Sequence, residues 1–177
     1  MKIEAFANSI STQSYKNKSV IDGVYLCELK KFNDDGGSFS EVLRTDENSI
    51  VENLPSEFKI AQVSWSILQP DTIKAFHLHY NQDDLWFVPG SESLLVGLYD
   101  IRDDSPTFKT QMRLMLGCGK SHILYIPRGV AHGCANLDSK PMHLIYFVNN
   151  KFDPDFPDEH RLPYSLLGDS FWEKTPG

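Results

Sequence analysis

Short apolar runs separated by turn-forming clusters dominate the hydrophobic pattern of this chain of 177 residues. Helical spacing of apolar residues, at i, i+3, i+4 and i+7, does not persist beyond two turns, and Gly or Pro interrupts most windows. The pattern predicts strands at 23–32, 61–68, 72–78, 85–88, 93–99, 111–116, 122–126, 133–136 and 142–147. Clusters rich in Asn, Asp, Gly and Pro separate these runs, at 33–37, 69–71, 89–91, 102–106 and 137–141. The chain is therefore predicted to form an all-β sandwich of the jelly-roll type.

One predicted strand, 61–68, has the period-2 pattern of a strand with one apolar and one polar face. Its apolar positions are Val63, Trp65 and Ile67, and its polar positions are Gln62, Ser64 and Ser66. We expect the apolar face to lie in the core, and the polar face to meet water or to line a pocket.

Length and composition indicate a single domain. A chain with 41% hydrophobic and 12% aromatic residues is large enough for one sizeable core and too short for two. We expect one domain over 1–177, with an irregular, acidic and proline-rich segment from about residue 149 that wraps the body as an ordered tail.

The charge balance argues against several kinds of partner. Seventeen basic and 24 acidic residues give a net charge of −7. This excess of acidic residues does not favour binding to the phosphate backbone of a nucleic acid. No run of 18 apolar residues occurs, and the first 20 residues lack the apolar run of a signal peptide, so we expect a cytoplasmic protein that does not cross a membrane. The three cysteines have no CxxC spacing, and we expect them to be reduced and mostly buried.

Three histidines and one aspartate form a candidate metal site. His77 and His79 are two residues apart in a predicted strand, so their side chains leave the same face, with Cα atoms about 6.5–7 Å apart. His132 follows a Pro-x-Gly turn, and Asp84 comes five residues after His79. Neutral imidazoles and a carboxylate suit a divalent metal such as Zn, Fe, Ni or Mn. The alternative is that these histidines make ordinary pocket or core hydrogen bonds.

The same residues stand in two segments that resemble the cupin motifs. The segment from Pro127 to Asn136 has the pattern P-x-G-x-x-H-x-x-x-N of the second motif. The H-x-H pair with Asp84 resembles the first motif, with aspartate where glutamate is usual. This resemblance implies a cupin-type jelly roll.

A second resemblance covers nearly the whole chain, from Gly23 to Trp172. In chain order it is carried by FNDDGGSFSE ending at Glu41, Gln62-x-Ser64-x-Ser66, KAFH at 74–77, DIRDDSPTF at 100–108, IPRGVAHG at 126–133 and LIYFVNNKFDP at 144–154. These segments resemble the dTDP-4-dehydrorhamnose 3,5-epimerase family, a branch of the cupins that acts on nucleotide sugars. The last matching segment, DEHRLPY at 158–164, is similar to that of short-form relatives.

The resemblance implies an isomerase that epimerises a nucleotide-linked 4-keto-6-deoxy sugar for cell-surface polysaccharide biosynthesis. It implies His77 as the base that removes a proton beside the ketone, and Tyr146 as the donor that returns one to the other ring face. On composition alone, Tyr146 is equally a core tyrosine. The resemblance further implies no cofactor, a homodimer, and substrate-binding roles for Glu41, Gln62, Ser64, Ser66, Lys74 and His132. Of these, Lys74 or His132 would stabilise the enolate oxygen.

Three departures from the family's pattern affect the candidate site. Gly36 replaces an arginine that grips the nucleotide phosphate, and Asp83 and Asp84 stand where a lysine is expected. The aspartate that orients the family's catalytic histidine lies beyond the matched part. Asp83, Asp84 or Asp169 would therefore have to orient His77.

Two other functions stay open at the level of sequence. One is a metal-dependent cupin enzyme that binds its metal through His77, His79, His132 and Asp84. The other is a non-catalytic cupin that holds a carbohydrate with Trp65, Trp86, Tyr80 and the polar strand residues.

Overall fold

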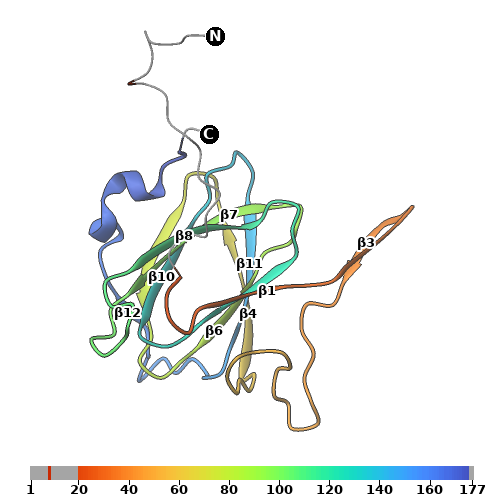
Figure 1. Cartoon of the computed structure of the whole chain (residues 1–177), viewed down its shortest axis with the longest axis horizontal. Helices are drawn as coiled ribbons and strands as arrows, with labels where there is room; N and C mark the ends of the chain where they lie inside the picture. The colour runs from red at the N-terminus through yellow and green to blue at the C-terminus, as the bar shows by residue number, and fades with distance from the viewer. Residues whose placement is uncertain (1–7, 9–19, 176–177) are drawn as a thin grey trace.

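Two antiparallel sheets form the body of the computed structural model, which describes residue 8 and residues 20–175 (Figure 1). The first sheet has the strand order Tyr25–Glu28 (β1), His122–Ile126 (β9), Asp84–Phe87 (β6), Met142–Val148 (β11) and Gln62–Leu68 (β4). The second has the order His160–Arg161 (β12), Ile73–Leu78 (β5), Val130–Ala135 (β10), Ser93–Asp100 (β7) and Gln111–Gly117 (β8). The prediction of an all-β jelly-roll sandwich is confirmed.

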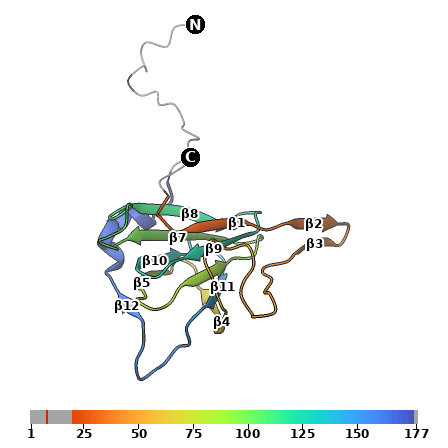
Figure 2. The same ribbon diagram turned by 60° about the horizontal axis from the view of Figure 1, so that its bottom comes forward.

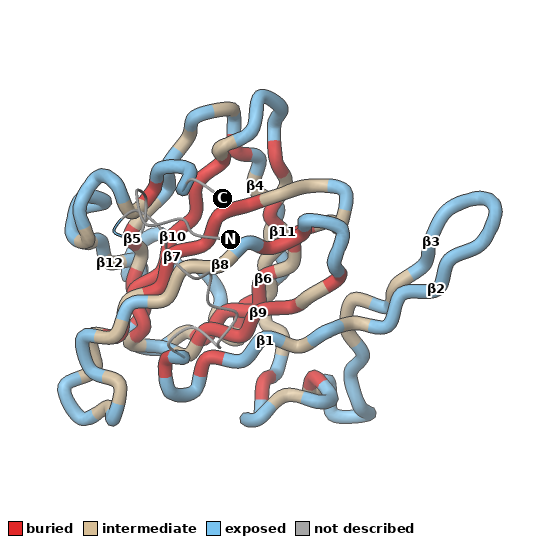
Figure 3. Tube along the Cα trace, turned by 45° about the horizontal axis from the view of Figure 1, so that its top comes forward, coloured by how far each residue is buried: buried red, intermediate tan, exposed pale blue. Residues whose placement is uncertain are grey.

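The first predicted strand, 23–32, is divided in the structure into β1 and the separate strand Lys31–Asp34 (β2). β2 pairs with Gly37–Ser40 (β3), a strand that the sequence pattern did not predict. In the turn between them, the Gly36 N–H donates to Asp34 Oδ1 over 2.8 Å. This β2–β3 hairpin, called the arm below, projects from the body and is almost entirely exposed (Figure 2 and Figure 3).

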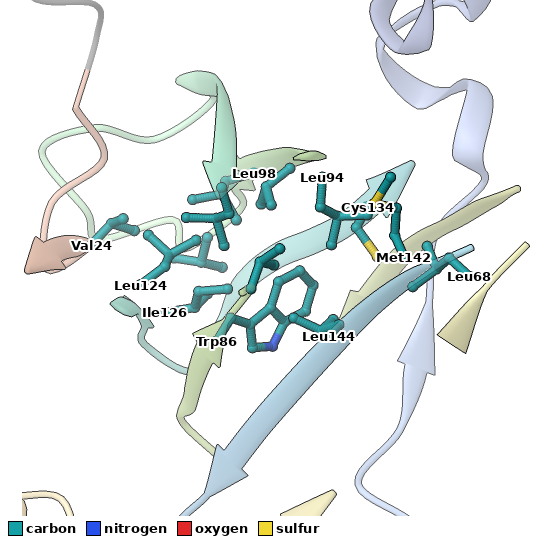
Figure 4. Close-up of a cluster of buried hydrophobic side chains, with 14 of the residues drawn as sticks. Val24, Leu68, Trp86, Leu94, Leu98, Leu124, Ile126, Cys134, Met142 and Leu144 are labelled. Carbon is teal, nitrogen blue, oxygen red and sulfur yellow. The ribbon is translucent and has the colours of Figure 1, made fainter. Parts of the chain in front are cut away.

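A core of buried aliphatic side chains lies between the two sheets (Figure 4). Leu124 and Leu144 of the first sheet belong to one cluster with Leu94 and Leu98 of the second, and Trp86 lies among them. Complete burial of a side chain of this size contributes about 1.5–3 kcal/mol. This cluster holds the two sheets together.

Two further clusters cover the outer faces of the sheets. On the first sheet, Phe58 packs edge-on against Tyr125, with ring centroids 6.2 Å apart. On the second sheet, Trp172 packs against Phe76, with ring centroids 5.3 Å apart. Trp172 belongs to the 3-10 helix Asp169–Trp172 (η3), which follows the 3-10 helix Tyr164–Leu167 (η2). The C-terminal segment is thus anchored on the second sheet.

The segment from about residue 149 also contains β12, which the proline-rich composition did not predict. β12 pairs antiparallel with β5, with His160 opposite Leu78 and Arg161 opposite His77. This pairing brings the acidic segment before β12 to the edge of the second sheet, beside a predicted catalytic residue.

The expectation that the apolar face of 61–68 lies in the core is wrong for this chain. Val63, Trp65 and Ile67 are 56%, 66% and 43% exposed, whereas the polar side chains of β4 face inward. β4 is the edge strand of its sheet, and the cluster around Phe58 packs over β6 and β9 instead. Within the described residues, the apolar face of β4 is therefore left uncovered.

All three cysteines are free, as expected, but only Cys134 is buried. Cys27 is half-buried, and Cys118 is exposed because it lies in the turn after β8. Among residues 20–175, no helix is long and apolar enough to span a membrane.

Candidate active site

A cavity of about 390 Å³ lies between the two sheets. Strands β4, β6 and β11 of the first sheet and β5, β10 and β12 of the second contribute to its walls. Its ionisable side chains are His77, His79, His132, Asp84, Glu159, Lys74, Arg161 and Tyr146. A concave site with several converging ionisable groups is the usual form of a small-molecule site, so this cavity is the candidate active site.

The register between β5 and β10 explains how Lys74 reaches the cavity. His77 lies opposite His132 and Lys74 lies opposite Cys134, so a three-residue step in β5 faces a two-residue step in β10. Such an irregularity changes which side chains share a face. Lys74 and His77 therefore both line the cavity, although regular alternation would put them on opposite faces. Burial raises the pKa of Cys134 to about 12, so the wall opposite Lys74 is uncharged.

His77 faces a carboxylate that no sequence motif indicated. Its Nδ1 atom lies 3.5 Å from Oε1 of Glu159. Burial lowers the pKa of His77, the Glu159 carboxylate opposes this shift, and Arg161 adds to it. At neutral pH the imidazole is therefore uncharged, which is the form that a general base requires.

The expectation that Asp83, Asp84 or Asp169 orients His77 is therefore wrong. Asp83 accepts hydrogen bonds from the Arg128 guanidinium, with Nε and one terminal nitrogen each at 2.9 Å. Asp84 accepts hydrogen bonds from Trp86 on β6 and from Gln82 just before that strand, and Asp169 is exposed in η3. Glu159 reaches His77 only because β12 pairs with β5, a long-range contact that no local pattern reveals.

Tyr146 reaches the cavity from the sheet opposite His77. It lies half-buried in β11, opposite Ser64 of β4, whereas His77 comes from β5 of the other sheet. Between the sheets, Lys74 Nζ donates a hydrogen bond to Ser66 Oγ over 2.8 Å. A ligand in the cavity would thus have the histidine on one side and the tyrosine on the other.

His79, Asp84 and His132 form a compact buried group beside His77. One nitrogen or carboxylate oxygen from each lies within 4.8 Å of the other two. Burial lowers the pKa of His132 to about 4, although the Asp84 carboxylate, with Oδ2 3.7 Å from Nε2, opposes this shift. His77 does not belong to this group, and its ring centroid is 6.2 Å from that of His132.

Three of the predicted binding residues do not line the cavity of this chain. Glu41 follows the arm, is exposed, and makes an ion pair of 2.8 Å with Arg44. Gln62 and Ser64 lie on the inward face of β4, where Gln62 Nε2 donates to Ser64 Oγ over 3.0 Å. The predicted residues that the structure brings together are therefore Ser66, Lys74, His77, His79, Asp84, His132 and Tyr146.

The cavity wall includes one aromatic and one cationic residue of the kinds that could contact a sugar or a phosphate. Of the aromatic residues considered for carbohydrate binding, Trp86 lines the cavity, whereas Trp65 and Tyr80 are 66% and 61% exposed and lie outside it. Arg161 of β12 contributes a cation to the cavity beside Lys74, and the sequence analysis did not single it out. A basic residue within an acidic, proline-rich segment gave no signal of its position.

The jelly roll and its ionisable cavity place the chain among the cupin-type enzymes. The family model for dTDP-4-dehydrorhamnose 3,5-epimerase matches residues 18–165. The chain belongs to this family, which confirms the resemblance found in the sequence and the assignment to the isomerases.

Relatives and solved structures agree with this membership. The spore coat polysaccharide biosynthesis protein SpsL of Bacillus subtilis (strain 168) is 43% identical over 145 residues, which cover 82% of this chain and 91% of that protein. The probable low-salt glycan biosynthesis epimerase Agl13 of Haloferax volcanii is 29% identical over 144 residues, which cover 81% and 88%. The dTDP-4-dehydrorhamnose 3,5-epimerase of Bacillus anthracis, solved with TDP and PPi bound, has a TM-score of 0.75 at 24% identity and 90% coverage of both chains. The structural likeness shows a shared fold.

Proposed function

We propose that the protein epimerises a nucleotide-linked 4-keto-6-deoxy sugar by proton transfer at a carbon beside the ketone. The observation that carries this proposal is the approach of His77 and Tyr146 to one cavity from opposite sheets. Inversion of a stereocentre needs a base on one face of the ring and a proton donor on the other, and this arrangement supplies both.

The proposed reaction uses groups already placed in the cavity. The free ring nitrogen of neutral His77 takes the proton from the carbon, and the bonding electrons move onto the ketone oxygen to form an enolate. The Lys74 ammonium stabilises the negative oxygen, and the Tyr146 hydroxyl returns a proton to the carbon from the other face. Glu159 stabilises the resulting imidazolium through Nδ1. Exchange with solvent restores both groups.

The nucleotide part of the proposed substrate needs a partner for its phosphates. A Legionella pneumophila epimerase with a TM-score of 0.71 was solved in complex with dTDP-4-keto-L-rhamnose. In this chain Gly36, at the turn of the arm, offers no cation, but Arg161 lines the cavity with a side chain that is 65% exposed. Arg161 is therefore the residue that we assign to the diphosphate, because a guanidinium binds phosphate oxygens in pairs.

The proposal is tested by incubating the protein with a dTDP-4-keto-6-deoxyhexose in heavy water and following deuterium entry beside the ketone by NMR. The His77→Ala variant should take up no deuterium, because the proposed base has been removed. The Tyr146→Phe variant should still exchange the proton on the His77 face but should no longer invert the centre. His143→Ala, outside the cavity on β11, is the control. Uptake that persists in His77→Ala would refute the assignment of the base.

We further propose a homodimer that works in the cytoplasm. Val63, Trp65 and Ile67 form an uncovered apolar face on an edge strand, and Phe32 and Phe39 are 59% and 66% exposed on the arm. A second copy of the chain is the occupant that would cover both. Three free cysteines suit a reducing compartment. Light scattering should give a dimer, and Trp65→Ser should shift it toward monomer while Tyr80→Ser does not. A monomeric native protein would refute the proposal.

A further inference from the structure

The cavity contains three buried groups whose possible metal-ligand atoms face one another. His79, Asp84 and His132 are 4%, 4% and 3% exposed, and their ligand-type atoms converge within 4.8 Å. They come from the end of β5, from β6 and from β10, so both sheets fix their positions. Among the described residues, no fully buried side-chain nitrogen or oxygen lacks a hydrogen-bond partner, so the convergence of these three groups is the observation that points to a cation.

The hydrogen bonds of both histidines direct the same ring nitrogen into this group. His132 Nδ1 contacts the Val130 carbonyl oxygen at 2.9 Å, and His79 Nδ1 contacts the Asp158 carbonyl oxygen. A carbonyl oxygen accepts only, so each Nδ1 carries the hydrogen and each Nε2 carries a lone pair. In the part of the chain that the structure describes, neither Nε2 atom makes a hydrogen bond.

Asp84 is also held in place by outer partners. Trp86 Nε1 donates to its Oδ2 over 3.0 Å, and Gln82 Nε2 donates to its Oδ1 over 2.9 Å. Metal-binding imidazoles usually donate their second nitrogen to a carbonyl or carboxylate, and metal-binding carboxylates are themselves hydrogen-bonded. The group therefore has the inner ligands and the outer supports of a metal site.

We propose that His79, Asp84 and His132 bind a divalent first-row transition cation such as Zn²⁺, Fe²⁺ or Mn²⁺. Two histidines and one carboxylate are a common ligand set for these ions. Ligand atoms bound to a tetrahedral ion at about 2.0–2.2 Å are about 3.3–3.6 Å apart. The distance of 3.7 Å from His132 Nε2 to Asp84 Oδ2 is close to this spacing. All three residues line the cavity that also contains His77 and Tyr146.

His77 does not belong to the proposed ligand set. The proposed site therefore has two histidines and one aspartate, and is not a three-histidine site. Its Nδ1 atom faces Glu159 at 3.5 Å, and it is not among the atoms that converge. The site does not depend on the proposed epimerase activity, because metal binding is measured without any sugar. Loss of one property therefore leaves the other testable.

The test begins with protein treated with a chelator and then dialysed. Titration with Co²⁺, followed by visible absorption, should show one ion per chain, and Zn²⁺ should displace it. Asp84→Asn and His132→Gln should each weaken binding by at least about 100-fold, more than the roughly 10–100-fold effect of losing an outer partner. His77→Gln and the control His143→Gln, which lies outside the cavity, should bind as the native protein does.

A spectroscopic measurement on the native protein tests the proposal even if a ligand variant fails to fold. Cu²⁺ loaded at one equivalent should show hyperfine coupling to two imidazole nitrogens in its EPR spectrum. Three results would overturn the proposal: no Co²⁺ binding below 1 mM, binding unchanged in folded Asp84→Asn and His132→Gln, or binding lost in His77→Gln.

Discussion

The contact between Glu159 and His77 makes a specific prediction about the pH dependence of the reaction. In Glu159→Gln the imidazole loses the carboxylate 3.5 Å from its Nδ1 atom. That carboxylate raises the pKa of His77, whereas burial, Arg161 and His79 lower it. The variant should therefore have a His77 pKa that lies still further below the usual value, and His77 should be a weaker base.

The size of the effect follows from distance and exposure. Two unit charges 3.5 Å apart interact by about 5 kcal/mol at an effective dielectric constant of 20 and by about 1 kcal/mol in water. The Glu159 side chain is 41% exposed, so the value near that of water applies, about 1–2 kcal/mol. An interaction of this size corresponds to about a tenfold loss in rate.

The assay is deuterium exchange into the 4-keto sugar between pH 4 and pH 9. The acid limb of kcat/KM, where protonation removes the base, should move to lower pH in Glu159→Gln. The plateau rate should fall about tenfold, because the imidazolium formed in the transition state has lost its partner. Glu57→Gln, an exposed carboxylate outside the cavity, should match the native profile. A rate loss without movement of the acid limb would refute the electrostatic role and leave a structural one.

Three further substitutions test the packing around the site by urea unfolding. In Gly97→Ala the new Cβ would lie 2.5 Å from a ring carbon of Phe171, so we expect a loss of about 1–3 kcal/mol; unchanged stability would mean that η3 does not pack on β7. Asp100→Asn should cost about 3 kcal/mol, because Asp100 is fully buried and pairs with Arg102 at 2.8 Å; an effect below 1 kcal/mol would contradict this. Phe58→Ala should lower the free energy of unfolding by about 3–5 kcal/mol, because Phe58 is fully buried against the first sheet. A smaller loss would show that the segment between β3 and β4 packs loosely on that sheet.

The hydrophobic pattern was sufficient to predict most strands of the sandwich. Each strand has its own alternation of apolar and polar residues and is bounded by turn-forming residues. The predicted strand 122–126 has the bounds of β9, and 142–147 differs from β11 by one residue. The pattern was insufficient at the ends of the chain. The arm and β12 are short, exposed strands with polar or proline-rich neighbours, so hydrophobic periodicity does not distinguish them from loops.

Alternation also cannot say which face of a strand is inside. In β4 the residues Gln62, Ser64 and Ser66 face inward, and Ser66 lines the cavity. The apolar side chains are outside because no described element covers them. The polar face was expected to meet water or to line a pocket, and Ser66 does line the cavity.

Some residues of the site could be predicted from local sequence, and others could not. His77 and His132 were predictable as neighbours because strand spacing and motif order place them, and the structure pairs them across β5 and β10. Glu159 and Arg161 were not predictable, because their position depends on a two-residue strand that joins β5 from a distance of more than 80 residues along the chain. Residues such as these, which contact the site but lie outside its sequence motifs, can be identified only once the fold is known.

The charge of Asp84 connects the proposed metal to the proposed reaction. A carboxylate near a developing enolate raises its energy, and this chain has Asp84 on the cavity wall where the family's pattern has a lysine nearby. A divalent cation bound to two neutral imidazoles and one carboxylate gives the group a net charge of +1, because the carboxylate cancels one of the two positive charges. That is the charge of the lysine that is missing. A bound cation would therefore add positive charge to that of Lys74 near the proposed enolate, and His77 would still be free to move the proton.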